Sequence, residues 1–150
     1  MPELLTQFLD LFGQPEFTLI EAHRASTHLS IGLLVGAVLF DCLAAVTRKS
    51  VLRDTAFWSQ VVGTVLLVGT FALGFYGNPV AGNQSELGQR AQFHFYAGCA
   101  VVGIFGVLAL WRIVRARGMG KIEIAAYSLL TLAGLAVITV TGWMGSRVMG

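Results

Sequence analysis

Four long apolar segments dominate the sequence, and each is long enough to cross a lipid bilayer. They run over residues 25–47, 55–76, 92–114 and 122–144, and a helix of about 20 residues spans a hydrocarbon core of ~30 Å. Hydrophobic residues make up 55% of the 150-residue chain and charged residues only 12%, which excludes an ordinary soluble domain. The sequence therefore predicts an all-α integral membrane protein. Because the connecting segments are short, we expect one four-helix bundle made of two tandem helical hairpins.

The basic residues are divided unevenly between the two ends of this bundle and indicate its orientation. Most of the ten lysines and arginines follow the first and third spans, and only three lie at the opposite end. The positive-inside rule then places both termini and the 77–91 loop outside the cytoplasm, on the periplasmic side of a bacterial inner membrane. The larger group comprises Arg48, Lys49, Arg53, Arg112, Arg115, Arg117 and Lys121, and the smaller group Arg24, Arg90 and Arg147.

A segment over residues 1–22 precedes the four-span domain, which covers residues 23–150. Leucine and phenylalanine recur in this segment at helical spacing among acidic residues. That pattern is typical of a short amphipathic helix lying on the periplasmic membrane surface. The segment lacks the basic start of a cleaved signal peptide. A docking surface for a partner subunit is the alternative interpretation.

Two cysteines, Cys42 and Cys99, lie in spans that run in the same direction through the membrane. Their depths differ by roughly 13 Å at about 1.5 Å per residue, which is too far for a disulfide. We expect both to be small buried hydrophobic residues.

The first and third spans begin with a repeated pattern. "RASTHLSIG" at 24–32 is echoed by "RAQFHFYAG" at 90–98, with a shared frame of R-A-x-x-H-x-x-x-G and an offset of 66 residues. The second and fourth spans also end alike, in "GFYG" at 74–77 and "GWMG" at 142–145. A repeat of two spans keeps the membrane orientation, so the halves should be related by a pseudo-twofold axis along the membrane normal. That symmetry would place His28 and His94 at one depth, facing each other.

The repeated frame suits a haem b group held between the hairpins. Two neutral imidazoles can ligate the iron axially, glycines one turn deeper let the backbone approach the macrocycle, and arginines one turn nearer the surface can pair with propionates. Such six-coordinate iron transfers electrons. The expected metal ligands are His28 and His94, and the expected cofactor contacts are Arg24, Gly32, Gly36, Arg90, Gly98, Trp143 and Met144. Met144 is an alternative axial ligand.

Each of these residue types also has a simpler explanation. Histidines at a membrane boundary are often interfacial, and the clustered Phe75, Tyr76 and Trp143 fit an aromatic belt. Glycines in membrane helices commonly serve close packing, and arginines extend to the headgroups. The joint recurrence of arginine, histidine and glycine favours the cofactor.

Two further polar residues, His23 and Asp41, stand outside the repeated frame. His23 lies five residues before His28 and so points about 140° away from it. We interpret it as a surface or propionate-contacting residue, with a second metal or haem site as an alternative. Asp41 lies near the basic loop, which favours an ion pair with Arg48 or Arg53 over a proton-relay or quinone role.

The stretch "HRASTHLSIGLLVGAVLFD" at 23–41 resembles the opening H-P-x-x-V-H-F-P-I-A-L…F-D of a family of bacterial four-helix membrane proteins of unknown function. The similarity extends over about 20–145 and includes a third-span histidine matching His94 and a glycine-rich end matching "GWMG". Members look like haem-bearing modules that accompany redox proteins, which implies ligand roles for His28 and His94. The sequence departs from the family pattern at Arg24 and Ser30, where prolines are usual.

The sequence thus predicts a cytochrome b-like electron-transfer subunit of a respiratory or photosynthetic complex, without catalysis of its own. Its expected partners are the other subunits of that complex, the lipid membrane, and a periplasmic electron carrier or a quinone. Two alternatives stay open. One is a cofactor-free structural or assembly subunit that packs through its glycine faces, and the other is a quinone-reactive subunit that uses His23 or Asp41.

Overall fold

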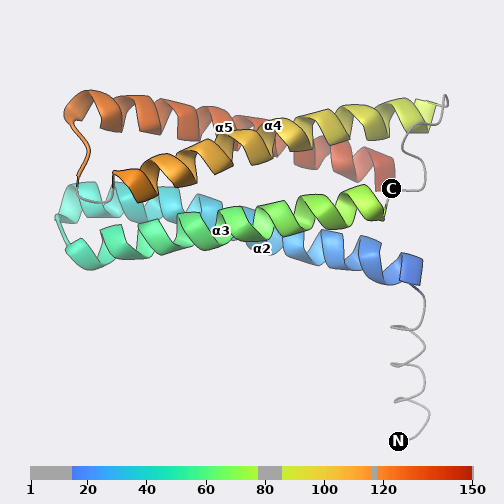
Figure 1. Ribbon diagram of the computed structural model, residues 1–150, viewed down its shortest axis with the longest axis horizontal. Coiled ribbons are helices and arrows are strands. Elements are labelled where there is room, and N and C mark those ends of the chain that lie inside the picture. The colour runs from blue at the N-terminus through green and yellow to red at the C-terminus, as the bar shows by residue number, and fades with distance from the viewer. Residues whose placement is uncertain (1–14, 78–85, 116–117, 150) are drawn as a thin grey trace, which may run out of the picture.

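The computed structural model describes residues 15–77, 86–115 and 118–149 and contains four long α-helices (Figure 1). They are α2 (Pro15–Thr47), α3 (Ser50–Tyr76), α4 (Glu86–Val114) and α5 (Lys121–Met149). The described residues include no β-strand. Each helix contains a stretch of 27 to 29 residues that is apolar enough to cross a membrane. The predicted all-α architecture with four membrane spans is confirmed.

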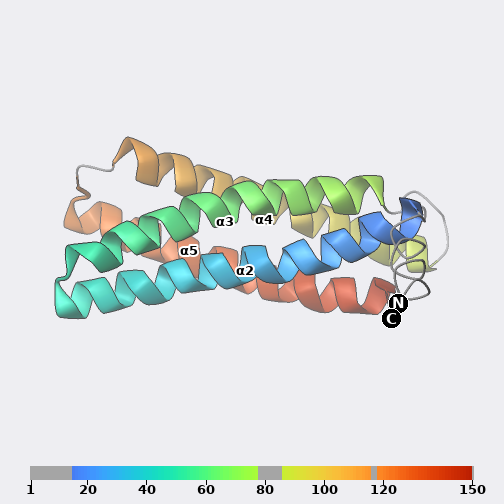
Figure 2. The same ribbon diagram turned by 90° about the horizontal axis from the view of Figure 1, so that it is seen from below.

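The helices pair as two hairpins that lie side by side. The first hairpin consists of α2 and α3 and the second of α4 and α5, and each is packed closely along its length (Figures 1 and 2). Between the hairpins, α3 packs against α4, whereas α2 and α5 touch least. Helix α2 begins and α5 ends at one end of the bundle, which we call the histidine end because His23 and His94 lie there. The opposite end, with the 48–49 and 115–120 connections, is the arginine end.

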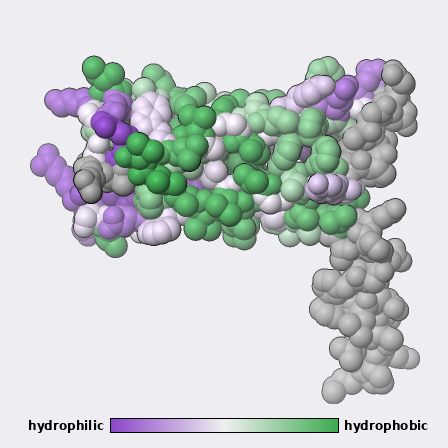
Figure 3. Space-filling view, viewed as in Figure 1, coloured by the Kyte–Doolittle hydropathy of each residue, from purple (hydrophilic) through white to green (hydrophobic). Residues whose placement is uncertain are grey.

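The surface matches a membrane environment. Apolar side chains form a broad band around the middle of the visible face, and hydrophilic residues gather at both ends (Figure 3). Many large apolar side chains are exposed along the helices, such as Leu39 and Leu110, as expected where lipid replaces water. The core between the helices is centred on the fully buried Leu34, Phe105 and Leu108.

The helices begin earlier than the expected spans, and one sequence expectation, the burial of the cysteines, was wrong. Helix α2 starts at Pro15, so the expected boundary between residues 22 and 23 falls inside a continuous helix; residues 1–14 of the expected amphipathic segment lie outside the described residues. Cys42 and Cys99 are free thiols, as expected, but both are exposed. The expectation of burial was wrong because these positions lie on outer helix faces, where an apolar residue can contact lipid.

Candidate ligand site between two histidines

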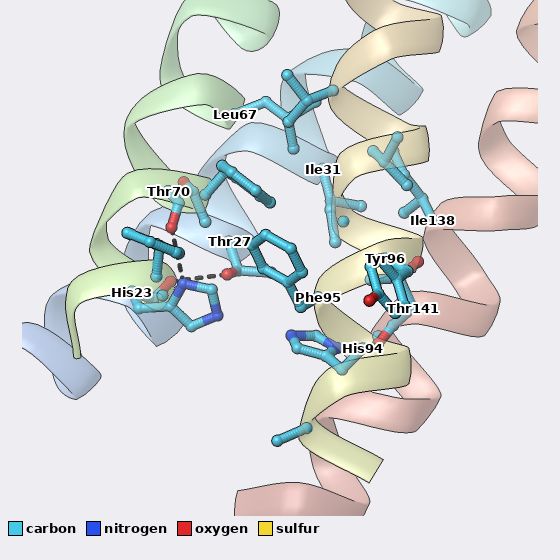
Figure 4. A pocket seen from close by; sticks show the side chains of 18 of the residues that line it. His23, Thr27, Ile31, Leu67, Thr70, His94, Phe95, Tyr96, Ile138 and Thr141 are labelled. Atoms are coloured by element: carbon cyan, nitrogen blue, oxygen red, sulfur yellow. Dashed lines mark hydrogen bonds between the residues drawn. The ribbon is translucent and has the colours of Figure 1, made fainter. Parts of the chain in front are cut away.

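His23 and His94 face each other between the two hairpins. His23 comes from α2 and His94 from α4, and their ring centroids lie 6.4 Å apart with the ring planes at 84° (Figure 4). In Figure 4 a nitrogen of each ring is directed across the gap toward the other ring. The two helices bring one imidazole each to the same depth at the histidine end.

Each histidine is oriented by a backbone carbonyl of its own hairpin. Nδ1 of His23 lies 2.8 Å from the carbonyl oxygen of Thr70, and Nδ1 of His94 lies 3.0 Å from that of Thr141. A carbonyl oxygen can only accept a hydrogen bond, so Nδ1 must carry the proton and donate it. In the neutral ring, Nε2 then keeps its lone pair and can bind a metal or accept a hydrogen bond.

A glycine leaves room for each ring. A Cβ atom added at Gly74 would lie 2.7 Å from Cε1 of His23, and one added at Gly145 would lie 2.9 Å from Cε1 of His94. Real Cβ atoms almost never approach another atom so closely, so any other residue at these positions would displace the imidazole. The two glycines are therefore part of the site.

These contacts reveal an internal repeat with an offset of 71 residues. The same set of interactions occurs in both hairpins: the histidine, the threonine whose carbonyl it binds, and the glycine beside its ring. A fourth pair lies deeper, where Gly63 packs on Leu34 and Gly134 on Phe105. The matched pairs are His23 and His94, Gly63 and Gly134, Thr70 and Thr141, and Gly74 and Gly145.

The offset of 66 residues expected from the sequence was therefore wrong. The offset of 66 matched His28 with His94 because the flanking arginine, alanine and glycine are identical in the two segments. The contacts instead match His23 with His94, and the residue equivalent to His28 is Cys99. The correct offset was visible as a shared G-x6-T-x3-G pattern at 63–74 and 134–145. The "GFYG" and "GWMG" matches drew attention to the wrong glycines.

The histidines line a cavity with a volume of about 270 Å³. All four helices contribute to it, and its lining is predominantly apolar (Figure 4). The deeper part, toward the membrane centre, is formed by aliphatic side chains such as Ile31, Leu67 and Ile138. Such a cavity, apolar with a few oriented polar groups, is typical of small-molecule sites.

The structure does not bring His28 to this cavity. Its side chain is exposed, and it is not among the lining residues. Of the other expected contacts, Gly98 lines the cavity. Gly32 is exposed with open space beside it, and a Cβ at Gly36 would meet only Phe40 of its own helix.

The expected propionate partners, Arg24 and Arg90, form ion pairs elsewhere, and the two remaining expected contacts also lie outside the cavity. Arg24 lies 3.4 Å from Glu21 and Arg90 lies 3.8 Å from Glu86, each within one helix. The ring of Trp143 is exposed, with the guanidinium of Arg147 4.2 Å from its centroid. Arg24, Arg90, Trp143 and Met144 do not line the cavity.

The arginine end contains the second polar contact between the hairpins. Nη1 and Nη2 of Arg112 each donate a hydrogen bond of 2.6 Å to a carboxylate oxygen of Asp41, and Nη1 also lies 3.3 Å from the hydroxyl of Tyr127. The expectation that Asp41 forms an ion pair is confirmed, but its partner is Arg112 and not Arg48 or Arg53. Asp41 and Arg112 are themselves equivalent positions, 71 residues apart.

The fold and these contacts define a class of protein, namely a four-span membrane bundle built from two repeated hairpins. A family model matches residues 19–149, and the chain belongs to that family, described as predicted membrane protein DUF2231. The resemblance to a membrane-protein family of unknown function is thereby confirmed. No curated protein and no solved structure matches the chain.

Proposed function

We propose that this protein is a membrane b-type cytochrome that holds one haem b between His23 and His94 and transfers electrons within a larger redox complex. The observation that carries the proposal is the 6.4 Å separation of the two imidazole centroids. Two metal–nitrogen bonds of about 2 Å on opposite sides of one ion, with the ring radii added, give a separation of about 6 Å. The spacing suits two axial ligands of a single metal.

The number of protein ligands favours haem over a bare ion. Among the described residues, no group of three or more histidine, cysteine, aspartate or glutamate side chains lies close enough to hold a metal. Zinc in a structural site takes four protein ligands. A tetrapyrrole brings four nitrogens of its own and leaves two axial positions, which is the number of histidines present.

The surroundings of the pair also fit this cofactor. The carbonyls of Thr70 and Thr141 fix the imidazole tautomers and make Nε2 more basic. The predominantly apolar cavity wall suits the apolar faces of a macrocycle. When bound, haem b supplies one-electron chemistry, and with two axial histidines it offers no open position to a substrate.

The charge distribution supports an orientation for this site. Among the described residues, six basic side chains lie at the arginine end and three at the histidine end, so the positive-inside rule favours a cytoplasmic location for the arginine end. The histidine pair then lies near the periplasmic side of a bacterial inner membrane, within reach of a periplasmic carrier or a partner subunit. A cysteine introduced at Gly120, in a chain without Cys42 and Cys99, tests this. An impermeant maleimide should label it only after the cells are opened.

The haem proposal is tested by the absorption spectrum of the purified full-length protein, followed by a pyridine haemochrome assay. We expect a low-spin b-type spectrum at about one haem per chain. His23→Ala and His94→Ala should each abolish it. His28→Ala is the matched control, because His28 lies on the same helix as His23 but is exposed; it should leave the spectrum unchanged.

Two outcomes would count against the proposal. A colourless, folded protein from haem-replete cells would favour a cofactor-free structural subunit. Loss of haem in His28→Ala, with His23→Ala unaffected, would assign the ligand role to the residue outside the cavity. A quinone-reactive role for Asp41 has less support, because Arg112 occupies both of its carboxylate oxygens.

A further inference from the structure

The two sides of the histidine cavity are closed very differently, although the repeat makes them equivalent. One side is the edge between α3 and α4, and the other is the edge between α2 and α5. A tetrapyrrole is too large for a cavity of about 270 Å³ to enclose, so part of any bound macrocycle must emerge through one of these edges. The side chains along the two edges indicate which one.

The α3–α4 edge is lined by a cluster of aromatic rings. The ring of Phe95 lies 5.4 Å from that of Phe71 and 5.8 Å from those of Phe75 and Tyr96. The ring of Phe71 also covers Gly98, where an added Cβ would lie only 3.2 Å from it. These centroid distances lie within the usual range for aromatic pairs, so the rings form an aromatic wall along this edge.

The α2–α5 edge lacks such a wall. The position equivalent to Phe71 is Gly142, which lines the cavity and is exposed, and a Cβ added there would have no atom within 4 Å. Helices α2 and α5 also make the fewest contacts of any neighbouring pair. The positions equivalent to Phe75, Phe95 and Tyr96 are Ser146, Arg24 and Ala25.

We propose that a flat tetrapyrrole enters between α2 and α5 and keeps one edge exposed there, with Gly142 as the residue that admits it. This inference rests on the proposed haem function. The absence of a side chain at Gly142 leaves space beside α5, while the aromatic wall at the α3–α4 edge supports the opposite edge of the macrocycle. Electrons would then be exchanged with a partner that approaches the α2–α5 face.

The test fills the opening without disturbing the helices. Gly142→Leu places a side chain in open space, so the apoprotein should keep its helix content by circular dichroism. Haem affinity should fall about tenfold or more, because the added side chain overpacks the occupied site. Gly69→Leu is the matched control: Gly69 is also an exposed helix glycine with no atom within 4 Å, but it does not line the cavity. It should bind haem like the wild type.

A labelling experiment tests the direction separately. In a chain without Cys42 and Cys99, Gly142→Cys should react with a small membrane-permeant thiol reagent in the apoprotein and be protected by haem. Tyr76→Cys is the control, because Tyr76 of α3 is exposed and does not line the cavity; its thiol should react in both states. Full haem binding by Gly142→Leu, or a Gly142→Cys thiol that haem does not protect, would overturn the inference and leave the haem proposal intact. A wild-type protein without haem would overturn both.

Discussion

The two hairpins touch through polar side chains at both ends of the bundle, and these two contacts differ in kind. At the histidine end, equivalent positions carry the same residue, and a cavity lies beside the facing imidazoles. At the arginine end, equivalent positions carry opposite charges, and Asp41 and Arg112 are in direct contact. The two contacts are about 27 Å apart along α2. Identical residues across a pseudo-twofold axis suit a symmetric ligand, whereas complementary residues need none.

The ion pair at the arginine end also gives a reason why the first hairpin packs against the second and not against a copy of itself. Around a true twofold axis, a residue faces its own copy, so two first hairpins would oppose aspartate to aspartate and two second hairpins arginine to arginine. Like charges at close range disfavour both pairings. The ion pair therefore favours association of the first hairpin with the second.

The largest effect is expected from removing Asp41. Asp41→Ala leaves the guanidinium of Arg112, whose side chain is 11% exposed, without its counter-charge, and such a loss costs about 3–5 kcal/mol. Arg112→Ala should cost less, because Asp41 is 35% exposed and can be hydrated. Unfolding by denaturing detergent in micelles measures both. Equal losses for the two variants would contradict the idea that burial of Arg112 determines the cost.

Reversal of the ion pair is the next test. Because positions 41 and 112 are equivalent in the repeat, the double variant Asp41→Arg with Arg112→Asp should recover much of the stability that either single change loses. A double-mutant cycle should give a coupling energy of about 1–3 kcal/mol. If the double variant is as unstable as the sum of the single changes, the two positions are not interchangeable and the pseudo-symmetry stops short of the arginine end.

The sequence predicts the architecture well because hydropathy and helix length directly determine membrane spans. Four apolar segments and short connections were sufficient for the two-hairpin bundle. The site was harder to predict from the sequence. The similarity between two nine-residue segments was more conspicuous than the sparser G-x6-T-x3-G pattern, which gives the offset of 71. "RASTHLSIG" and "RAQFHFYAG" share four residues, yet only one histidine of that pair reaches the cavity. The histidine that faces His94 in the structure is His23. Its position depends on the carbonyl and the glycine that lie across the hairpin, in contacts that join residues 47 to 51 positions apart.

The ion pair shows a similar limit. Nearby arginines in the 48–53 segment were reasonable partners for Asp41 by sequence distance. The observed partner lies 71 residues away because the pseudo-twofold axis brings equivalent positions together. Had the offset of 71 been known, both polar contacts would have followed from it.

The smallest effect concerns the glycines that pack within each hairpin, and it tests whether the repeat extends to energetics. An added Cβ at Gly63 would lie 3.1 Å from Leu33 and Leu34, and one at Gly134 would lie 3.0 Å from Ile104 and Phe105. Gly63→Ala and Gly134→Ala should therefore cost similar amounts, about 1–3 kcal/mol each, in the same micelle unfolding assay.

Gly103 supplies the matched control, because it is a helix glycine with no atom within 4 Å. Gly103→Ala should leave stability unchanged or raise it by about 0.5–1 kcal/mol, since alanine loses less backbone entropy in a helix. A loss at Gly63 without one at Gly134 would mean that the neighbours of Gly134 can shift where those of Gly63 cannot. The two hairpins would then have equivalent residues at equivalent positions but differ in how rigidly these residues are packed. The cavity at the histidine end would lie between one rigid hairpin and one that adapts more easily.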